Sequence, residues 1–336
     1  MSNDFNITVC PSTLQEGFNT YSPKAIKEVF NGIKVSHILP FSSPAIEGKE
    51  QINFIEKRKR ISISGVQEKY SLKLVNGKFE LTEAGGDYIL KPIPTDVLLA
   101  SQVPANEHLT MQIAAQVFKL LVAKCAIIFF KSGEPAYMTK RFDVLPNGKR
   151  CLKEDFASLA QFSSQNKGTN YKYEYSYLQM SELIDAYFPA AIHAKEQFLK
   201  LILFNYLFSN GDAHLKNFSR IDCEGKGDGQ LSPAYDLLNT NIHTNDGFFA
   251  LENGLYDKDY EHPSFSKLGF YGYNDFVTFG TKMGLLETRI KRIMNTFLED
   301  KEVVLKLISN SFLNEKTKEV YLKDYHTRLT MLGGKL

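Results

Sequence analysis

The stretch FSNGDAHLKNFSRIDCEGKGDGQLSPAYDLLN, residues 208–239, crowds charged and amide side chains onto two predicted turns. Asp212 and Asn217 are five residues apart, and Asp236 follows Asp212 by 24 residues (236 − 212 = 24). The first turn comes directly after a strongly apolar helix, and a predicted hairpin separates it from the second. Because polar groups are costly to bury without partners, such a cluster predicts a functional site. The alternative is a helix C-cap followed by a surface turn.

These side chains have the composition of a phosphoryl-transfer site. Such a site needs one carboxylate to orient the attacking hydroxyl, and oxygen ligands to hold Mg²⁺ against nucleotide phosphates. The spacing from Asp212 to Asn217 equals that of the H-R-D-x-x-x-x-N loop of protein kinases. Asp212 is therefore the candidate base, Asn217 and Asp236 are candidate metal ligands, and Lys216 is a candidate counter-charge for the γ-phosphate. His214 could contact the nucleotide or a carboxylate, although a single histidine is more often structural.

Composition describes an ordinary globular protein. The chain has 336 residues, 43% hydrophobic and 23% charged, with a net charge of +2, so it is not a polyelectrolyte. The length favours two domains or one bilobal domain. We find no secretory signal and no apolar run long enough to span a membrane, so we expect a cytoplasmic protein without membrane contact. The four cysteines form no C-x-x-C pair and are expected to be reduced, and the histidine spacing does not favour a zinc site.

The order of predicted elements indicates two lobes. Residues 61–145 read as strand, strand, helix, strand, strand, with a hairpin turn at Asn76 and Gly77 and a helix over 104–121. Residues 146–336 are mainly helical, with predicted helices at 154–162, 178–187, 193–209, 274–283, 287–298, 300–312 and 315–332. We therefore predict an α+β, bilobal, protein-kinase-like fold, with a β-rich N-lobe and an α-helical C-lobe around a cleft.

Residues 1–60 are expected to form a loosely built N-terminal extension with one short helix near 22–32. The basic cluster at 57–60 is interpreted as a solvated surface, with a substrate or nucleic-acid contact as the alternative. The aromatic run YKYEYSY at 171–177 is predicted to pack on a surface, although such a run can also stack bases.

The predicted N-lobe holds the candidate nucleotide-binding residues. The turn SISGVQEKYSLKL, residues 62–74, has a single glycine and matches neither the Walker nor the kinase glycine pattern, so a plain hairpin turn is an alternative. Its place before the strand that ends at Lys91 favours backbone N–H groups facing a phosphate. The candidate phosphate-binding residues of this turn are Gly65, Val66 and Gln67.

Lys91 itself could reach the α- and β-phosphates, with Glu107 in the next helix as its ion-pair partner. A lysine at a strand end is more often solvated. The segment 139–143, which includes Lys140 and Phe142, takes the position of the hinge whose backbone pairs with adenine in a two-lobed kinase.

Six motifs then allow a resemblance to be stated. In chain order they are SISGVQEKYSL, ILKP, ANEHLTMQIA, KRFD, NGDAHLKNFS and LSPAYDLL. The chain resembles the HipA family of serine/threonine toxin kinases over roughly residues 60–240, in the order seen in that family. The resemblance implies a protein kinase that uses ATP and Mg²⁺. By position it makes Asp212 the catalytic base, Asn217 and Asp236 the metal ligands, and Lys91 the ATP lysine.

The resemblance also implies a biological setting. Members are toxins of toxin–antitoxin modules that phosphorylate an aminoacyl-tRNA synthetase, and they pair with a helix-turn-helix, HipB-like antitoxin that binds DNA. DNA would thus be contacted only through the antitoxin. Because about 60 residues precede the glycine-containing turn, the N-terminal subdomain of long members is expected to be absent or abbreviated, and a separate small protein could supply it.

Ser62 and Ser64 are the implied autophosphorylation sites, as in the shorter HipT-like members. A phosphate there would repel the ATP phosphates and inactivate the kinase. Two other functions remain open from the sequence. One is a small-molecule or lipid kinase on the same lobes, and the other is a nucleotide-dependent regulatory binding module.

Overall fold

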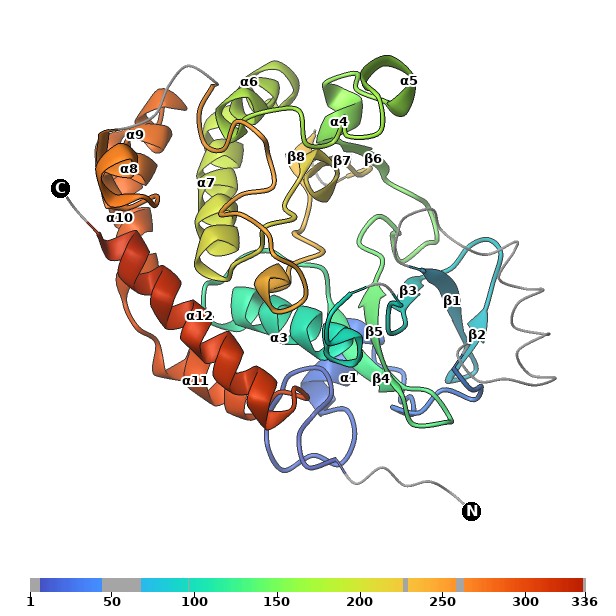
Figure 1. Cartoon of the computed structure of the whole chain (residues 1–336). Helices are drawn as coiled ribbons and strands as arrows, with labels where there is room; N and C mark the ends of the chain where they lie inside the picture. Colours follow the sequence, from blue (N-terminus) through green and yellow to red (C-terminus); the bar gives the residue numbers. More distant parts are fainter. Residues whose placement is uncertain (1–6, 44–67, 96, 226–228, 258–262, 335–336) are drawn as a thin grey trace.

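The computed structural model describes residues 7–43, 68–95, 97–225, 229–257 and 263–334. The described chain forms a lobe that carries a five-stranded sheet and a larger, mainly helical lobe (Figure 1). Within the described ranges, no helix combines the length and the apolar character that a membrane crossing requires.

The N-lobe is built on an antiparallel sheet with the strand order β2-β1-β3-β5-β4. Its strands are β1 (Tyr70–Val75), β2 (Lys78–Leu81), β3 (Tyr88–Lys91), β4 (Cys125–Phe129) and β5 (Pro135–Lys140). β1 and β2 are joined at Asn76 and Gly77, whose φ angles of 49° and 76° are those of a two-residue hairpin turn. In the register of β3 with β5, Lys91 lies opposite Tyr137.

Helix α3 (Val103–Gln116) covers this sheet and is buried at every position from 103 to 114. It follows η1 (Ala100–Gln102), and Pro104 lies in its first turn, where a missing backbone N–H costs nothing. The helix ends before the predicted boundary at residue 121, because the chain turns away at Lys119, which has a φ of 55°. Val122 then pairs with Ala234 of the C-lobe in a parallel bridge.

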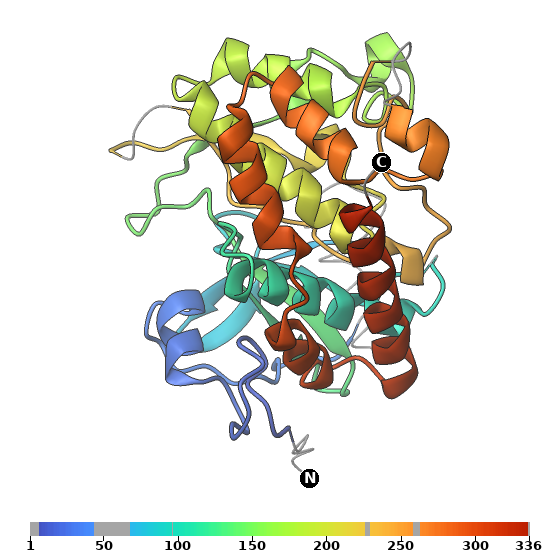
Figure 2. The ribbon, with the colours of Figure 1, turned by 90° about the vertical axis from the view of Figure 1, so that its left-hand side faces the viewer.

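The N-terminal segment belongs to the core of this lobe. Helix α1 (Pro23–Val29) lies beside the sheet (Figure 2). Cys10, Tyr21, Phe30 and Leu39 share one apolar cluster with residues of β1, β3, β4 and β5. Residues 7–43 are therefore a packed part of the lobe and not the loosely built extension that we expected, because their scattered apolar residues find partners only on the folded sheet.

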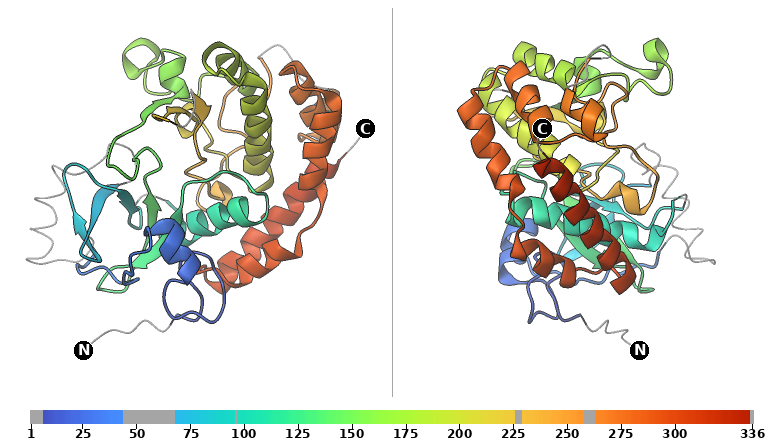
Figure 3. Two further views of the ribbon diagram at one scale, coloured as in Figure 1. Left: turned by 180° about the vertical axis from the view of Figure 1, so that it is seen from behind. Right: turned by 60° about the vertical axis from the view of Figure 1, so that its left-hand side comes forward.

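The C-lobe is organised around helix α7 (Ala191–Leu207), which is buried from Leu201 to its end. Its other helices are α4 (Phe156–Leu159), α5 (Ser164–Lys167), α6 (Tyr177–Tyr187), α8 (Pro263–Leu268), α9 (Tyr273–Lys282), α10 (Glu287–Leu298), α11 (Glu302–Ser309) and α12 (Glu315–Gly333). α11 packs against α3 while α12 packs against α7, so the C-terminal helices join the two lobes (Figure 3).

A small sheet of the C-lobe packs against α4 and α7. It has the order β6-β7-β8, formed by β6 (Leu152–Asp155), β7 (Ser219–Asp222) and β8 (Gln230–Leu231). The predicted helix at 154–162 was therefore wrong in its first part. The local pattern could not show that residues 152–155 pair with β7, which lies more than 60 residues later.

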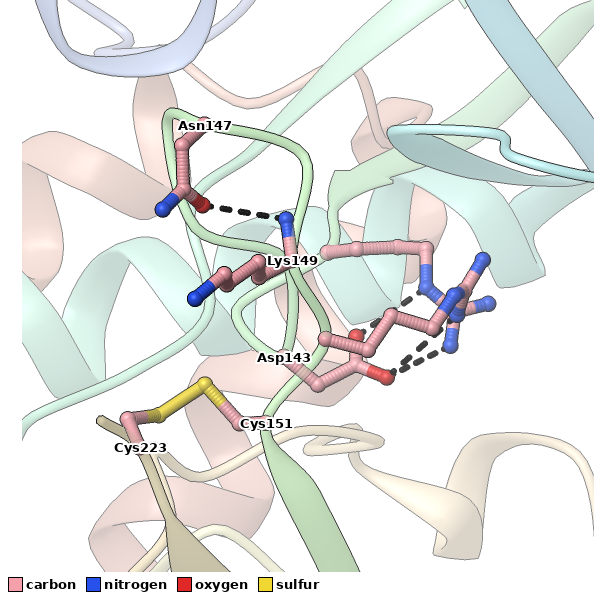
Figure 4. Close-up of a disulfide and its surroundings, with 7 residues drawn as sticks. Asp143, Asn147, Lys149, Cys151 and Cys223 are labelled. Carbon is pink, nitrogen blue, oxygen red and sulfur yellow. Dashed lines mark hydrogen bonds and ion pairs between the residues drawn. A yellow bond between two sulfur atoms is a disulfide. The ribbon is translucent and has the colours of Figure 1, made fainter.

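A disulfide links Cys151 to Cys223, and these two cysteines are therefore not the reduced thiols that the sequence suggested (Figure 4). Cys151 precedes β6 and Cys223 follows β7, and the pairing of Leu152 with Asp222 brings the two Cα atoms to 4.5 Å. A separation of 72 residues hides this proximity from the sequence. The other two, Cys10 and Cys125, are free and buried.

Reduction of this disulfide is expected to destabilise the protein by about 2–4 kcal/mol, because closing a long loop restricts the unfolded chain. The measurement is the denaturation midpoint with and without dithiothreitol. A variant carrying Cys151→Ser and Cys223→Ser is the control, and its midpoint should be lower and indifferent to reductant. A wild-type midpoint that reductant leaves unchanged would contradict this expectation.

Candidate active site

A buried ammonium group lies at the junction of the two lobes. Lys91, at the end of β3, is 4% exposed, and its Nζ lies 2.7 Å from Oε1 of Glu107 in α3. The same Nζ donates to Oδ1 of Asp236, which follows β8. The ring of Tyr137 lies beneath it, with Nζ 5.3 Å from the ring centroid. One lysine thus connects a strand, a helix and a C-lobe loop.

The charges of this cluster depend on one another. Burial on its own would lower the pKa of Lys91, but the carboxylates of Asp236 and Glu107 outweigh it and raise this pKa above its ordinary value. Burial raises the pKa of Glu107 to about 6 in spite of the opposing charge of Lys91. For Asp236, Lys91 and Lys69 outweigh burial and hold the pKa below its usual range. At neutral pH the lysine is therefore cationic and Asp236 anionic.

Asp236 is held in an uncommon backbone conformation. Its φ is 56°, in the left-handed region that few residues other than glycine adopt. Its carbonyl accepts a hydrogen bond from Nδ2 of Asn210 at 3.4 Å. Its Oδ2 lies 3.4 Å from Nδ2 of Asn217, in the single turn η2 (Leu215–Asn217). The two candidate metal ligands, which come from separate turns, are therefore neighbours.

The donors of this pair fit Mg²⁺. Carboxylate and carboxamide oxygens are hard ligands of the kind that this ion prefers, and Mg²⁺ usually takes only one or two of them from the protein, with water and substrate phosphate completing its shell. Among the described residues, no group of three or more His, Cys, Asp or Glu side chains could hold a metal ion alone. Asn217 and Asp236 are thus suited to a metal that is shared with a phosphorylated substrate.

The backbone before Asp212 is packed too closely for any residue except glycine at position 211. A Cβ on Gly211 would lie 2.4 Å from the Cβ of Asp246, which is well inside any real contact. The amide of Gly211 donates to Oγ1 of Thr240 at 2.9 Å, and the amide of Asp212 donates to Oδ1 of Asn210 at 3.3 Å. This close packing fixes the position from which Asp212 projects.

The side chain of Asp212 is 50% exposed, and its Oδ1 accepts a hydrogen bond from the hydroxyl of Tyr173 at 3.0 Å. Burial raises the pKa of Asp212, while Lys172 and Tyr173 oppose that rise. The contacts of the described residues do not join Asp212 to Asn217 or Asp236. The structure brings the two metal-ligand candidates, Asn217 and Asp236, together. Asp212 lies on the same loop as Asn217, and its side chain is half exposed to solvent.

His214 is not suited to act as a charged group. Its Nε2 lies 4.0 Å from Oδ1 of Asp212, which is too far for a hydrogen bond, and its Nδ1 is buried without a partner among the described residues. Burial lowers the pKa of His214 to about 4, so the ring is neutral at pH 7. Its backbone amide donates to Oδ1 of Asn217 at 3.1 Å. The geometry indicates a role in shaping the loop.

The remaining candidates are more scattered. Lys216 is exposed and forms none of the ion pairs found within the described ranges, while its carbonyl accepts from the hydroxyl of Tyr235. The Nζ of Lys140 donates to Oδ1 of Asn31 at 2.5 Å and is not part of the Lys91 cluster. Phe142 stacks on Tyr235, the neighbour of Asp236, with ring centroids 5.6 Å apart. Gly65, Val66, Gln67, Ser62 and Ser64 lie outside the described residues.

Three residues of the site escaped the sequence interpretation. Lys69 lies 3.9 Å from Oδ2 of Asp236, and its only signal was its place in the motif SISGVQEKYSL. Lys153 lies over the ring of Tyr235 at 4.5 Å, but its segment was predicted to be near a helix start and carried no signal. Tyr173 was assigned to surface packing with the rest of its aromatic run.

A cavity of about 530 Å³ lies beside the segment between β5 and β6. Its walls include Leu121, Phe142 and Pro233, and its lining contains neither Lys91 nor Asp236. The candidate catalytic side chains therefore lie outside this cavity.

Comparisons with known proteins identify the family of the chain. Residues 61–304 match the family model of the HipA-like C-terminal domain. A putative kinase of Haemophilus influenzae is 26% identical over 348 residues, which cover 98% of each chain. The putative kinase Y4dM of Sinorhizobium fredii is 31% identical over 197 residues, covering 54% of this chain and 45% of that protein.

Two solved structures share the fold. One is HipA of Shewanella oneidensis, from its complex with HipB and operator DNA, with a TM-score of 0.53 and 22% identity over 86% of this chain and 72% of that one. The other is the proinflammatory kinase CtkA of Helicobacter pylori, with a TM-score of 0.52 and 18% identity over 79% of this chain and 90% of that one.

The expected α+β, kinase-like bilobal fold is confirmed by these structures. The family model extends over well more than half of the sequence and includes Lys91, Asp212, Asn217 and Asp236. The resemblance inferred from the six motifs is thereby confirmed, and the chain belongs to the HipA-like family of kinases.

Proposed function

We propose that this protein is a serine/threonine protein kinase that uses ATP and Mg²⁺ and acts as the toxin of a toxin–antitoxin module. The observation that carries the proposal is the contact of Lys91 with both Glu107 and Asp236, with Asn217 beside Asp236. A buried cation next to two oxygen ligands is the arrangement that a triphosphate and its metal require.

Each side chain then has a specific task. Glu107 holds the ammonium of Lys91 at the lobe junction, where it would bind the α- and β-phosphates of ATP as a point charge. Asn217 and Asp236 would hold Mg²⁺, which would neutralise charge on the phosphates. Asp212 accepts the proton of the substrate hydroxyl, since its carboxylate is accessible and its backbone is fixed.

The partners follow from the family. HipA of Shewanella oneidensis was solved with HipB and operator DNA, so we infer a helix-turn-helix antitoxin for this chain and a contact with DNA only through it. The substrate is an aminoacyl-tRNA synthetase, and the reaction takes place in the cytoplasm.

Asp212→Asn is expected to lower the rate of phosphoryl transfer by about 10²–10⁴-fold, since it removes the general base. Transfer of labelled γ-phosphate to a protein extract measures this. Asp300→Asn, which alters an exposed carboxylate that pairs with His326, is the control with unchanged transfer. An Asp212→Asn enzyme with near-normal transfer would exclude Asp212 as the base. Transfer to metabolites or lipids in place of protein would favour the small-molecule or lipid kinase.

Lys91→Met is expected to abolish measurable transfer and also to destabilise the fold by about 3–5 kcal/mol, because Glu107 would remain buried without its partner. Adding Glu107→Gln should recover much of the lost stability but none of the activity. Lys195→Met is the matched control, since Lys195 is also buried but its Nζ bonds to Asp185 and not to this cluster. Activity in the double variant would show that Lys91 serves the fold alone.

Replacing both Ser62 and Ser64 with alanine is expected to increase toxicity on expression, because the inhibitory phosphate can no longer form. Growth after induction gives the readout. Mass spectrometry of the wild type after incubation with ATP provides the direct check, and a chain without phosphate on either serine would refute the autophosphorylation mechanism.

A further inference from the structure

Residues 170–175, which join α5 to α6, form a segment that we call the aromatic strap. The strap lies against the catalytic loop, residues 210–217, which carries Asp212. The carbonyl of Lys172 accepts a hydrogen bond from the amide of Leu215 at 3.2 Å, three residues beyond Asp212. The carbonyl of Tyr173 accepts from the amide of Glu252 at 3.1 Å and from the amide of Tyr175 at 2.9 Å. The strap is thus anchored both to the catalytic loop and to the segment around residue 252.

The side chain of Tyr173 is located by three contacts. Its hydroxyl donates to Oδ1 of Asp212 at 3.0 Å. Its ring meets the ring of His214 edge-on, with centroids 5.3 Å apart and planes at 69°. The ammonium of Lys172 lies over the same ring, 4.8 Å from the centroid. This is a tightly defined position for a hydroxyl that touches the candidate base.

A general base must lie within hydrogen-bond reach of the proton that it removes, so the orientation of its carboxylate matters. A half-exposed aspartate has several rotamers, and only some of them present an oxygen correctly. A carboxylate has about four lone-pair positions, so a hydrogen bond to Oδ1 leaves Oδ2 able to accept from a substrate. A fixed donor on Oδ1 therefore reduces the reorganisation that the reaction requires.

We propose that Tyr173 is a positioning residue of this kinase, whose hydroxyl holds Oδ1 of Asp212 so that Oδ2 is presented to the acceptor hydroxyl of the protein substrate. The inference rests on the proposed function, because it assumes that Asp212 is the base. It gives the aromatic strap a role in positioning the base, which is separate from the binding of nucleotide and metal.

The electrostatic surroundings agree with this role. Five groups face or influence the carboxylate of Asp212: Lys172 and Tyr173 from the strap, His214 from its own loop, Asp236 from the metal-ligand turn and Asp246 from the segment after η3 (Thr240–Ile242). Burial and the two aspartates raise the pKa of Asp212, whereas Lys172 and the Tyr173 hydroxyl lower it. Burial and Asp212 also raise the pKa of Tyr173, so the phenol keeps its proton and stays a donor.

The test is Tyr173→Phe in the full chain, which removes the hydroxyl and keeps the ring. We expect kcat to fall by roughly 10–100-fold, as for the loss of a hydrogen bond to a charged group, with the KM for ATP unchanged. The acid limb of the pH–rate profile should move to higher pH, because the ionised form of Asp212 loses a donor. Tyr175→Phe is the control and should change neither, since its ring contacts Phe162 and not the base.

Two results would overturn the proposal. An unchanged kcat and acid limb in Tyr173→Phe would show that the hydroxyl has no positioning role. A higher kcat, or a lower KM for the protein acceptor, would show that Tyr173 obstructs the acceptor position.

If Tyr173→Phe is unstable, 3-fluorotyrosine at position 173 serves instead. Its more acidic phenol is a stronger donor and should move the acid limb of the pH–rate profile to lower pH. An acid limb that does not move would refute the proposal.

The outcome with Asp212→Asn separates this inference from the proposed function. Loss of transfer in Asp212→Asn together with normal kinetics in Tyr173→Phe would refute only the positioning role. Near-normal transfer in Asp212→Asn would refute the base itself.

Discussion

A buried ammonium group must keep anionic partners, and this requirement at Lys91 governs how the two lobes meet. Removing a charge from water is costly unless it is paired and hydrogen-bonded. Lys91 obtains its partners from two different places, Glu107 on α3 and Asp236 on the loop after β8. If either lobe moved, Lys91 or one of its carboxylate partners would be buried without an opposite charge, at a cost in free energy. The cluster therefore holds β3, α3 and the loop after β8 in one arrangement. The residues that suit nucleotide binding are thus also the residues that orient the lobes.

The position of Glu107 depends in turn on contacts of α3 with the C-lobe. The carboxamide of Asn106 donates to the carbonyl of Asn239 at 2.8 Å and accepts from the amide of Asn239 at 3.0 Å. One turn later, the hydroxyls of Thr110 and Tyr321 are 2.8 Å apart, which links α3 to α12. These buried polar contacts sit next to apolar packing against α11, and buried polar groups tolerate little change in geometry. Helix α3 is therefore hydrogen-bonded to the C-lobe while it packs on its own sheet.

The sequence predicted the site best where the residues that act together are also close together in the chain. Asp212 and Asn217 lie on one short loop, and a hairpin turn with glycine at Gly77 can be read from two residues. Signals failed where a partner lies far along the chain. The last two residues of β6 were taken for helix because the pairing of β6 with β7 is nonlocal, and the disulfide from Cys151 to Cys223 follows from the same pairing. Tyr173 was noted only as one member of the aromatic run at 171–177, because its contact with Asp212 exists only after the strap has folded over the loop.

The sequence alone determined the α+β bilobal class and the family, because these depend on periodicity and on motifs that are contiguous in the chain. It also supplied the residue types that a phosphoryl-transfer site needs. The tertiary structure decided which of those side chains meet: it joins Lys91 to Asp236 across 145 positions and leaves Asp212 in contact with Tyr173. The physical reason is that local pattern sets secondary structure, whereas the pairing of charges depends on distances that only packing of the whole chain establishes.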